Sequence, residues 1–101
     1  MTDREANAIL DALAQYAHIL RESAAATSRA EDRATYQSRL AGAAEMFECV
    51  RVRKSREELG TLIKREQHAF GWGYLSQEPG ARAEAAFAAL VRALQGASHA
   101  T

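Results

Sequence analysis

Three short segments, each with a Ser or Thr three residues ahead of a Glu, constrain the fold of this chain more than any other feature. They are Thr2/Glu5, Ser28/Glu31 and Ser55/Glu58. In such a capping box the hydroxyl accepts a hydrogen bond from a free N–H of the first helical turn, and the glutamate reaches back to the cap residue. The pattern therefore predicts helices that begin near residues 3, 29 and 56.

One proline and two glycines mark the remaining helix boundaries. Pro79 fits the first turn of a fourth helix, since its missing N–H would have no helical partner there. Gly71 and Gly96 directly follow two predicted helices and can take the left-handed conformation that ends a helix. The predicted helices are 3–25, 29–53, 56–70 and 79–95, within one domain over 1–96 that is followed by a flexible tail over 97–101.

Apolar side chains recur on one face of each predicted helix. Their spacing of three and four residues brings them to one side, because a helix turns about 100° per residue. They are Ile9, Leu10, Leu13, Tyr16, Ala17 and Leu20 in the first helix; Tyr36, Leu40, Ala43, Phe47 and Val50 in the second; Leu59, Leu62, Ile63 and Phe70 in the third; and Ala83, Phe87, Leu90, Val91 and Leu94 in the fourth. No segment has the pattern of a strand, so the predicted fold class is all-α, a small four-helix bundle.

The second and third helices are open to another interpretation, as one continuous helix. On such a helix the apolar stripe before Val50 and the stripe after Leu59 would differ by about 130°, so both could not face one neighbour. We therefore predict a break near Lys54 and Ser55. An uninterrupted helix in an extended dimer is the alternative.

Length, charge and cysteine content narrow the class of protein. A chain of 101 residues has room for one domain that buries little surface, so self-association would add stability. Thirteen basic side chains balance thirteen acidic ones, which gives no net attraction to nucleic acid or an anionic membrane. The single Cys49 excludes an intrachain disulfide, and no apolar segment reaches the roughly 20 residues that span a bilayer. The first residues lack the pattern of a secretory signal, so we expect a soluble, cytoplasmic protein.

Met46, Cys49 and Val52 form a second apolar strip in the second predicted helix, away from the face that carries Phe47 and Val50. One interpretation is a central helix that neighbours within the chain cover on both sides. The other is an interface with a partner or a second subunit, because contiguous exposed apolar surface usually marks a contact. If this strip is an interface, we expect the Cys49 thiol to be accessible or to lie at a subunit contact.

An aromatic segment over 70–75 places Trp72 between two glycines, with Tyr74 beside it. Trp and Tyr are enriched where binding energy concentrates, so both are candidate partner-binding residues. The preferred interpretation is a plug, in which the rings fold over the end of the bundle and the glycines allow sharp turns.

A basic run over 51–56 suggests nucleic-acid binding as an alternative function. Its basic residues are Arg51, Arg53, Lys54 and Arg56. On a helix these four charges would point in different directions, and two of them would face glutamates one turn along. A solvated turn whose charges pair locally is therefore the preferred interpretation.

Glu66 is a charged residue on the apolar face of the third predicted helix. A buried carboxylate is rarely tolerated without a partner, so an arginine should reach it. Arg33 and Arg51 lie on the apolar seam of the second helix, and Arg51 is preferred because it is nearer the turn into the third. The alternative is a perturbed carboxylate that serves a ligand pocket.

Metal-binding and catalytic motifs are not found in the sequence. His18 and His68 lie opposite the apolar stripes of their helices, and a lone cysteine makes no zinc pattern. Phosphate-binding loops and nucleophile motifs do not occur. The sequence therefore favours a non-enzymatic module, a small regulator, adaptor or inhibitor, without cofactor or metal, that binds a protein partner or itself as a homodimer. The alternatives are a nucleic-acid-associated regulator that uses 51–56, and a ligand-binding or enzymatic bundle around Glu66.

Overall fold

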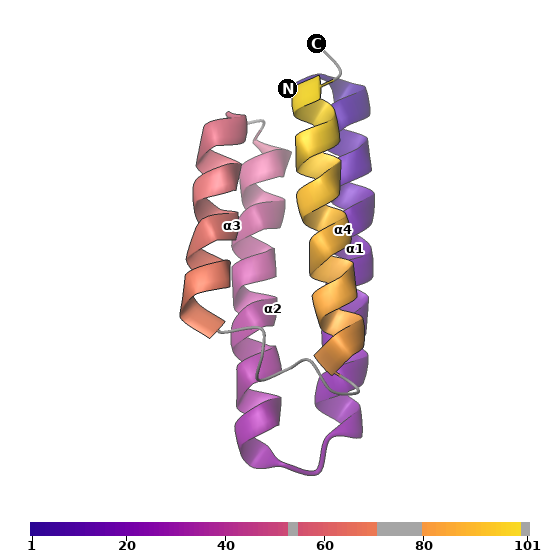
Figure 1. Ribbon diagram of the computed structural model, residues 1–101, viewed down its shortest axis with the longest axis vertical. Coiled ribbons are helices and arrows are strands. Elements are labelled where there is room, and N and C mark those ends of the chain that lie inside the picture. The colour runs from indigo at the N-terminus through magenta and orange to yellow at the C-terminus, as the bar shows by residue number, and fades with distance from the viewer. Residues whose placement is uncertain (53–54, 71–79, 100–101) are drawn as a thin grey trace.

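The described part of the chain folds into four helices, which run alternately up and down in Figure 1. The computed structural model describes residues 1–52, 55–70 and 80–99, and this part of the chain contains no strand. The helices are α1 (Asp3–Ala26), α2 (Ala30–Arg51), α3 (Arg56–Phe70) and α4 (Gly80–His99). The prediction of an all-α four-helix bundle is confirmed.

Two of the three predicted caps are present in the structure. At the start of α1, Thr2 Oγ1 accepts a hydrogen bond from Glu5 N at 3.2 Å, and the Glu5 carboxylate accepts one from Thr2 N at 3.2 Å. At the start of α3, Ser55 Oγ accepts a hydrogen bond from Glu58 N at 3.2 Å. In both places the hydroxyl satisfies a backbone donor that has no partner within the helix.

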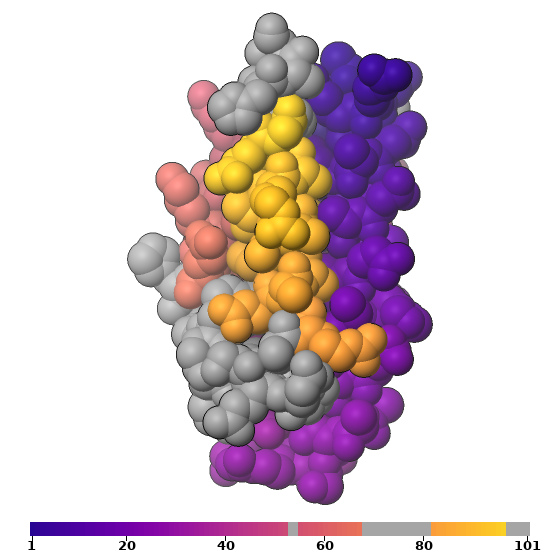
Figure 2. Space-filling view, turned by 45° about the vertical axis from the view of Figure 1, so that its right-hand side comes forward, coloured from indigo at the N-terminus to yellow at the C-terminus, as the bar shows by residue number. Residues whose placement is uncertain are grey.

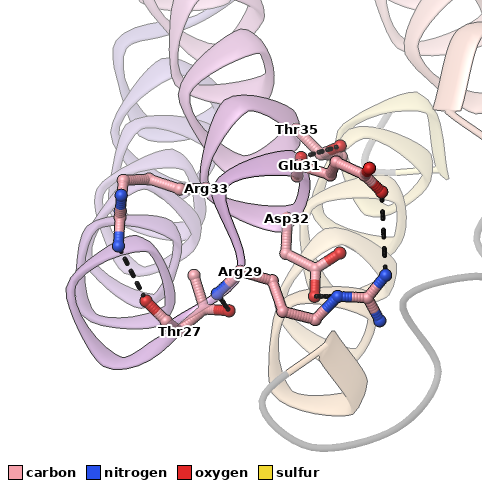
Figure 3. Close-up of polar contacts among 6 residues, drawn as sticks. All are labelled: Thr27, Arg29, Glu31, Asp32, Arg33 and Thr35. Carbon is pink, nitrogen blue, oxygen red and sulfur yellow. Dashed lines mark hydrogen bonds and ion pairs between the residues drawn. The ribbon is translucent and has the colours of Figure 1, made fainter.

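The predicted cap at Ser28 is wrong, because the turn between α1 and α2 uses other groups (Figure 3). The cap residue of α2 is Arg29, whose side chain makes no capping hydrogen bond. Instead, Thr27 Oγ1 accepts from Arg29 N at 3.3 Å, and the Thr27 carbonyl accepts from the Arg33 guanidinium at 3.0 Å. The Arg29 guanidinium lies beside the carboxylates of the first turn of α2. The turn is therefore held by Thr27 and two arginines, and Ser28 is left exposed.

The helix ends agree with the prediction between α2 and α3 but not at the end of α4. The chain leaves α2 after Arg51 and re-enters helix at Arg56, antiparallel to α2, which excludes one continuous helix. By contrast, α4 continues through Gly96 to His99. A glycine inside a helix costs only about 1 kcal/mol relative to alanine, so Gly96 alone does not end α4.

The core is centred on α1, which packs along its length against both α2 and α4. The largest apolar side chains that are completely or almost completely buried are Ile9, Leu13, Tyr16 and Leu20 from α1, Tyr36, Met46 and Val50 from α2, Leu59 from α3, and Phe87 and Leu90 from α4. Full burial of one such aliphatic side chain contributes about 1.5–3 kcal/mol. The shorter α3 packs mainly against α2 and touches α4 at only a few positions, so one side of the bundle is less tightly closed than the others.

Candidate functional site

Four side chains, one from each helix, form a layer across the core of the bundle, and three of them are polar. We call it the buried layer. Arg39 of α2 and Tyr16 of α1 are completely buried, and Glu66 of α3 is 4 % exposed. Arg39 Nη1 donates a hydrogen bond to Tyr16 Oη at 3.4 Å. The ring of Phe87 from α4 meets the Tyr16 ring edge to face, with 5.3 Å between the ring centroids. Direct contacts therefore join α1, α2 and α4 in this layer, and the charge of Glu66 from α3 acts on both Arg39 and Tyr16.

Gly42 of α2 makes the space that the Glu66 carboxylate occupies. A Cβ atom at position 42 would overlap Glu66 Oε1, so no larger residue fits there without displacing the carboxylate. Glu66 Oε2 is buried and accepts no hydrogen bond within the described residues. Burial raises the pKa of Glu66, while the positive charges of Arg39 and Arg65 oppose that rise and the carboxylate of Glu45 adds to it.

The predicted ion pair between Glu66 and Arg51 or Arg33 is not present in the described residues, and the positive charges that act on Glu66 are those of Arg39 and Arg65. Arg51 instead pairs with Glu48 on the exposed surface of α2, and Arg33 donates to the Thr27 carbonyl. Arg39 could have been found from its spacing, since it lies three residues after Tyr36 on the stripe that becomes buried. The predicted stripe passed through Leu40 and Phe47, so Arg39 was not among its residues.

The Tyr16 phenol should titrate only in strong alkali. Burial is the largest influence and raises its pKa from 10.0 to about 12, although the hydrogen bond from Arg39 acts in the opposite direction. Between these two values the unfolded chain loses the proton before the folded chain, so the free energy of unfolding falls by about 1.4 kcal/mol per pH unit. Below pH 10 this contribution is constant. Spectrophotometric titration of the phenolate and alkaline unfolding, each compared with Tyr16→Phe, would measure both effects; an ordinary pKa for Tyr16 would contradict the buried layer.

The second apolar strip of α2 lies mostly inside the bundle, which favours the interpretation that helices of the same chain cover it. Met46 is completely buried and Cys49 is 5 % exposed, whereas Val52 is 46 % exposed. Met46 and Cys49 belong to the same core cluster as residues of the other three helices. The burial arises because the inward face of α2 runs through Arg39 and Met46 and not through Leu40 and Phe47, which are only half-buried. Cys49 is accordingly almost completely buried within a single chain.

The remaining candidate residues do not form one site in the described part of the chain. Arg51 is exposed and paired with Glu48, and Arg56 is half-buried at the start of α3. Arg53 and Lys54 lie outside the described residues, and so do Trp72 and Tyr74. Neither the nucleic-acid alternative nor the aromatic recognition loop gains support from the geometry.

One hollow of about 420 Å³ lies between α2 and α3. Its lining residues are Glu45, Glu48, Cys49, Glu58, Thr61 and Leu62. Glu45 pairs with Arg65 at 2.6 Å between N and O, and Glu48 pairs with Arg51. Since two of its three carboxylates are already neutralised by arginines of the same chain, this hollow has little free charge with which to bind a ligand.

A second hollow, of about 340 Å³, follows the seam between α3 and α4, where these two neighbouring helices barely touch. We call it the α3/α4 groove; its lining residues are Gln67, Glu84, Phe87, Ala88, Val91 and Arg92. Figure 2 shows the outer surface of α4 exposed along much of its length between α1 and α3. The groove has a half-buried apolar floor at Ala88 and Val91 and carries one acidic and one basic side chain.

Comparison with known proteins adds no assignment, since no family model, curated protein or solved structure matches the chain. Within residues 1–52, 55–70 and 80–99, no group of three or more His, Cys, Asp or Glu side chains is placed to hold a metal ion. None of the helices over the same ranges is both long and apolar enough to cross a membrane. The buried layer and the α3/α4 groove are therefore the two features of the described residues from which a function can be inferred.

Proposed function

We propose that this chain is a helical protein-interaction module, a small regulator, adaptor or inhibitor, whose partner lies in the α3/α4 groove. The observation that carries the proposal is the seam between α3 and α4: among the described residues α1 packs closely against two neighbours, whereas α3 and α4 make few contacts with each other. The small Ala88 on the groove floor permits the close approach of another helix, because the distance between helix axes depends on the side chains at the contact.

The buried Glu66 supports a structural role for this carboxylate in preference to an enzymatic one. A general acid or base must come within hydrogen-bond distance of its substrate. Glu66 is 4 % exposed, with Gly42 directly against the carboxylate and Arg39 supplying the compensating charge. Structural charge networks in a core also perturb carboxylates, so we propose a non-enzymatic module.

A photo-cross-linking amino acid at position 91 tests the proposed function in living cells. Position 91 lines the groove, whereas position 14, on the exposed side of α1, serves as the matched control. We expect a discrete adduct with another protein chain from position 91 and not from position 14. The added substitution Ala88→Glu should abolish that adduct, because it places a charge on the apolar floor. Equal labelling from both positions, or no adduct from position 91, would disprove a partner in the groove.

A further inference from the structure

The outer face of α4 has a charge pattern that is complementary to itself. Glu84 and Arg92 each lie four residues from Ala88, one before it and one after it, and all three line the α3/α4 groove. With a rise of 1.5 Å per residue, Glu84 and Arg92 are separated by about 12 Å along the helix axis, too far to pair with each other. Within the described residues, neither side chain has an ion-pair partner.

We propose, as an extension of the proposed function, that the partner in the groove is a second copy of this chain, with the two α4 helices antiparallel and crossing at Ala88. A twofold axis at that point places residues equally distant from Ala88 opposite each other. Glu84 of each copy then faces Arg92 of the other, which forms two equivalent ion pairs. The neighbouring positions on this face also match, since Ala85 meets Val91 of the second copy.

The size of the side chains fits the same arrangement. At the axis Ala88 meets its own equivalent, and two alanines let the helices approach closely. Charge pairs at the edge of such a contact fix its register and direction more than its affinity, and like charges in the same places oppose association. The pairing therefore predicts both a dimer and one particular alignment of the two helices.

Charge reversal and its rescue test this arrangement directly. We expect light scattering to give twice the chain mass for the wild type at high micromolar concentration. Glu84→Arg or Arg92→Glu replaces both attractive contacts with repulsive ones and should weaken dimerisation by about 10-fold or more. The double variant Glu84→Arg/Arg92→Glu restores opposite charges and should return the dimer constant to near the wild-type value. Asp11→Arg and Arg21→Glu, on the exposed surface of α1, are matched controls that should leave dimerisation unchanged.

A cysteine at the axis gives a second measurement that does not depend on charge. Ala88→Cys should form a symmetric disulfide-linked dimer under mild oxidation, and Ala14→Cys should not, with both tested in a Cys49→Ala background. A wild type that stays monomeric, a dimer unaffected by the single reversals, or a double variant that is not rescued would each overturn the proposed pairing. A monomeric wild type that still gives a cross-linked adduct from position 91 would leave the interaction module standing with a different partner.

Discussion

The variant Arg39→Met is expected to unfold with a free energy about 3–5 kcal/mol lower than that of the wild type. The substitution removes the larger of the two positive charges that offset the burial of Glu66, and a poorly compensated buried charge is among the most destabilising changes in a protein. The loss should shrink as the pH falls, because Glu66 can then take up a proton and become neutral. Denaturant unfolding at several pH values would measure both the loss and its pH dependence.

A double-mutant cycle separates the pair from the other effects of each substitution. Glu66→Gln combined with Arg39→Met should be less destabilising than the sum of the two single changes, since either one already removes the charge interaction. The matched control is Arg51→Met, whose guanidinium lies on the surface with Glu48, and it should be additive with Glu66→Gln. If Arg39→Met and Glu66→Gln proved additive, the two side chains would not interact in solution.

The variants Gly42→Ala and Gly60→Ala should change the stability in opposite directions, although both place alanine inside a helix. Alanine normally stabilises a helix interior by up to about 1 kcal/mol relative to glycine. A Cβ at Gly60 meets nothing within 4 Å, so Gly60→Ala should show this gain. At Gly42 the new methyl group overlaps the Glu66 carboxylate, and overpacking of this kind costs about 1–3 kcal/mol.

Introducing Gly42→Ala into a Glu66→Ala background tests whether the Glu66 carboxylate causes the loss of stability. With the carboxylate removed, Gly42→Ala should become neutral or stabilising, like Gly60→Ala in the wild type. Thermal or denaturant unfolding of the four variants and the wild type is sufficient for the test. A gain from Gly42→Ala in the wild-type background would show that α3 does not bring Glu66 against Gly42.

Local chemistry in the sequence was enough to predict most of the fold. The caps at Thr2 and Ser55 depend only on residues three positions apart, and the structure confirms both. The break between α2 and α3 followed from two apolar stripes that one helix could not direct to the same neighbour. Helix number, order and approximate length could therefore be predicted before any tertiary contact was known.

The candidate groove was not predictable from the same patterns. Phe87 and Val91 were expected on the inward stripe of the fourth helix, and Phe87 is indeed buried. Val91 is only half-buried because α3 packs mainly against α2 and leaves the side towards α4 open. That opening depends on how α2, α3 and α4 pack together, and the apolar periodicity of a single helix carries no information about such packing.

Tertiary structure alone decided which face of α2 turns inward. The periodicity favoured Leu40 and Phe47, yet the buried face runs through Arg39 and Met46. An arginine can occupy the core only where other helices supply a hydrogen-bond acceptor and an opposite charge, and here Tyr16 and Glu66 do so. The sequence by itself determined four helices and most of their boundaries, because those depend on neighbours within a few residues. The burial of Arg39 depends on groups from two other helices, and only the packed structure brings them together.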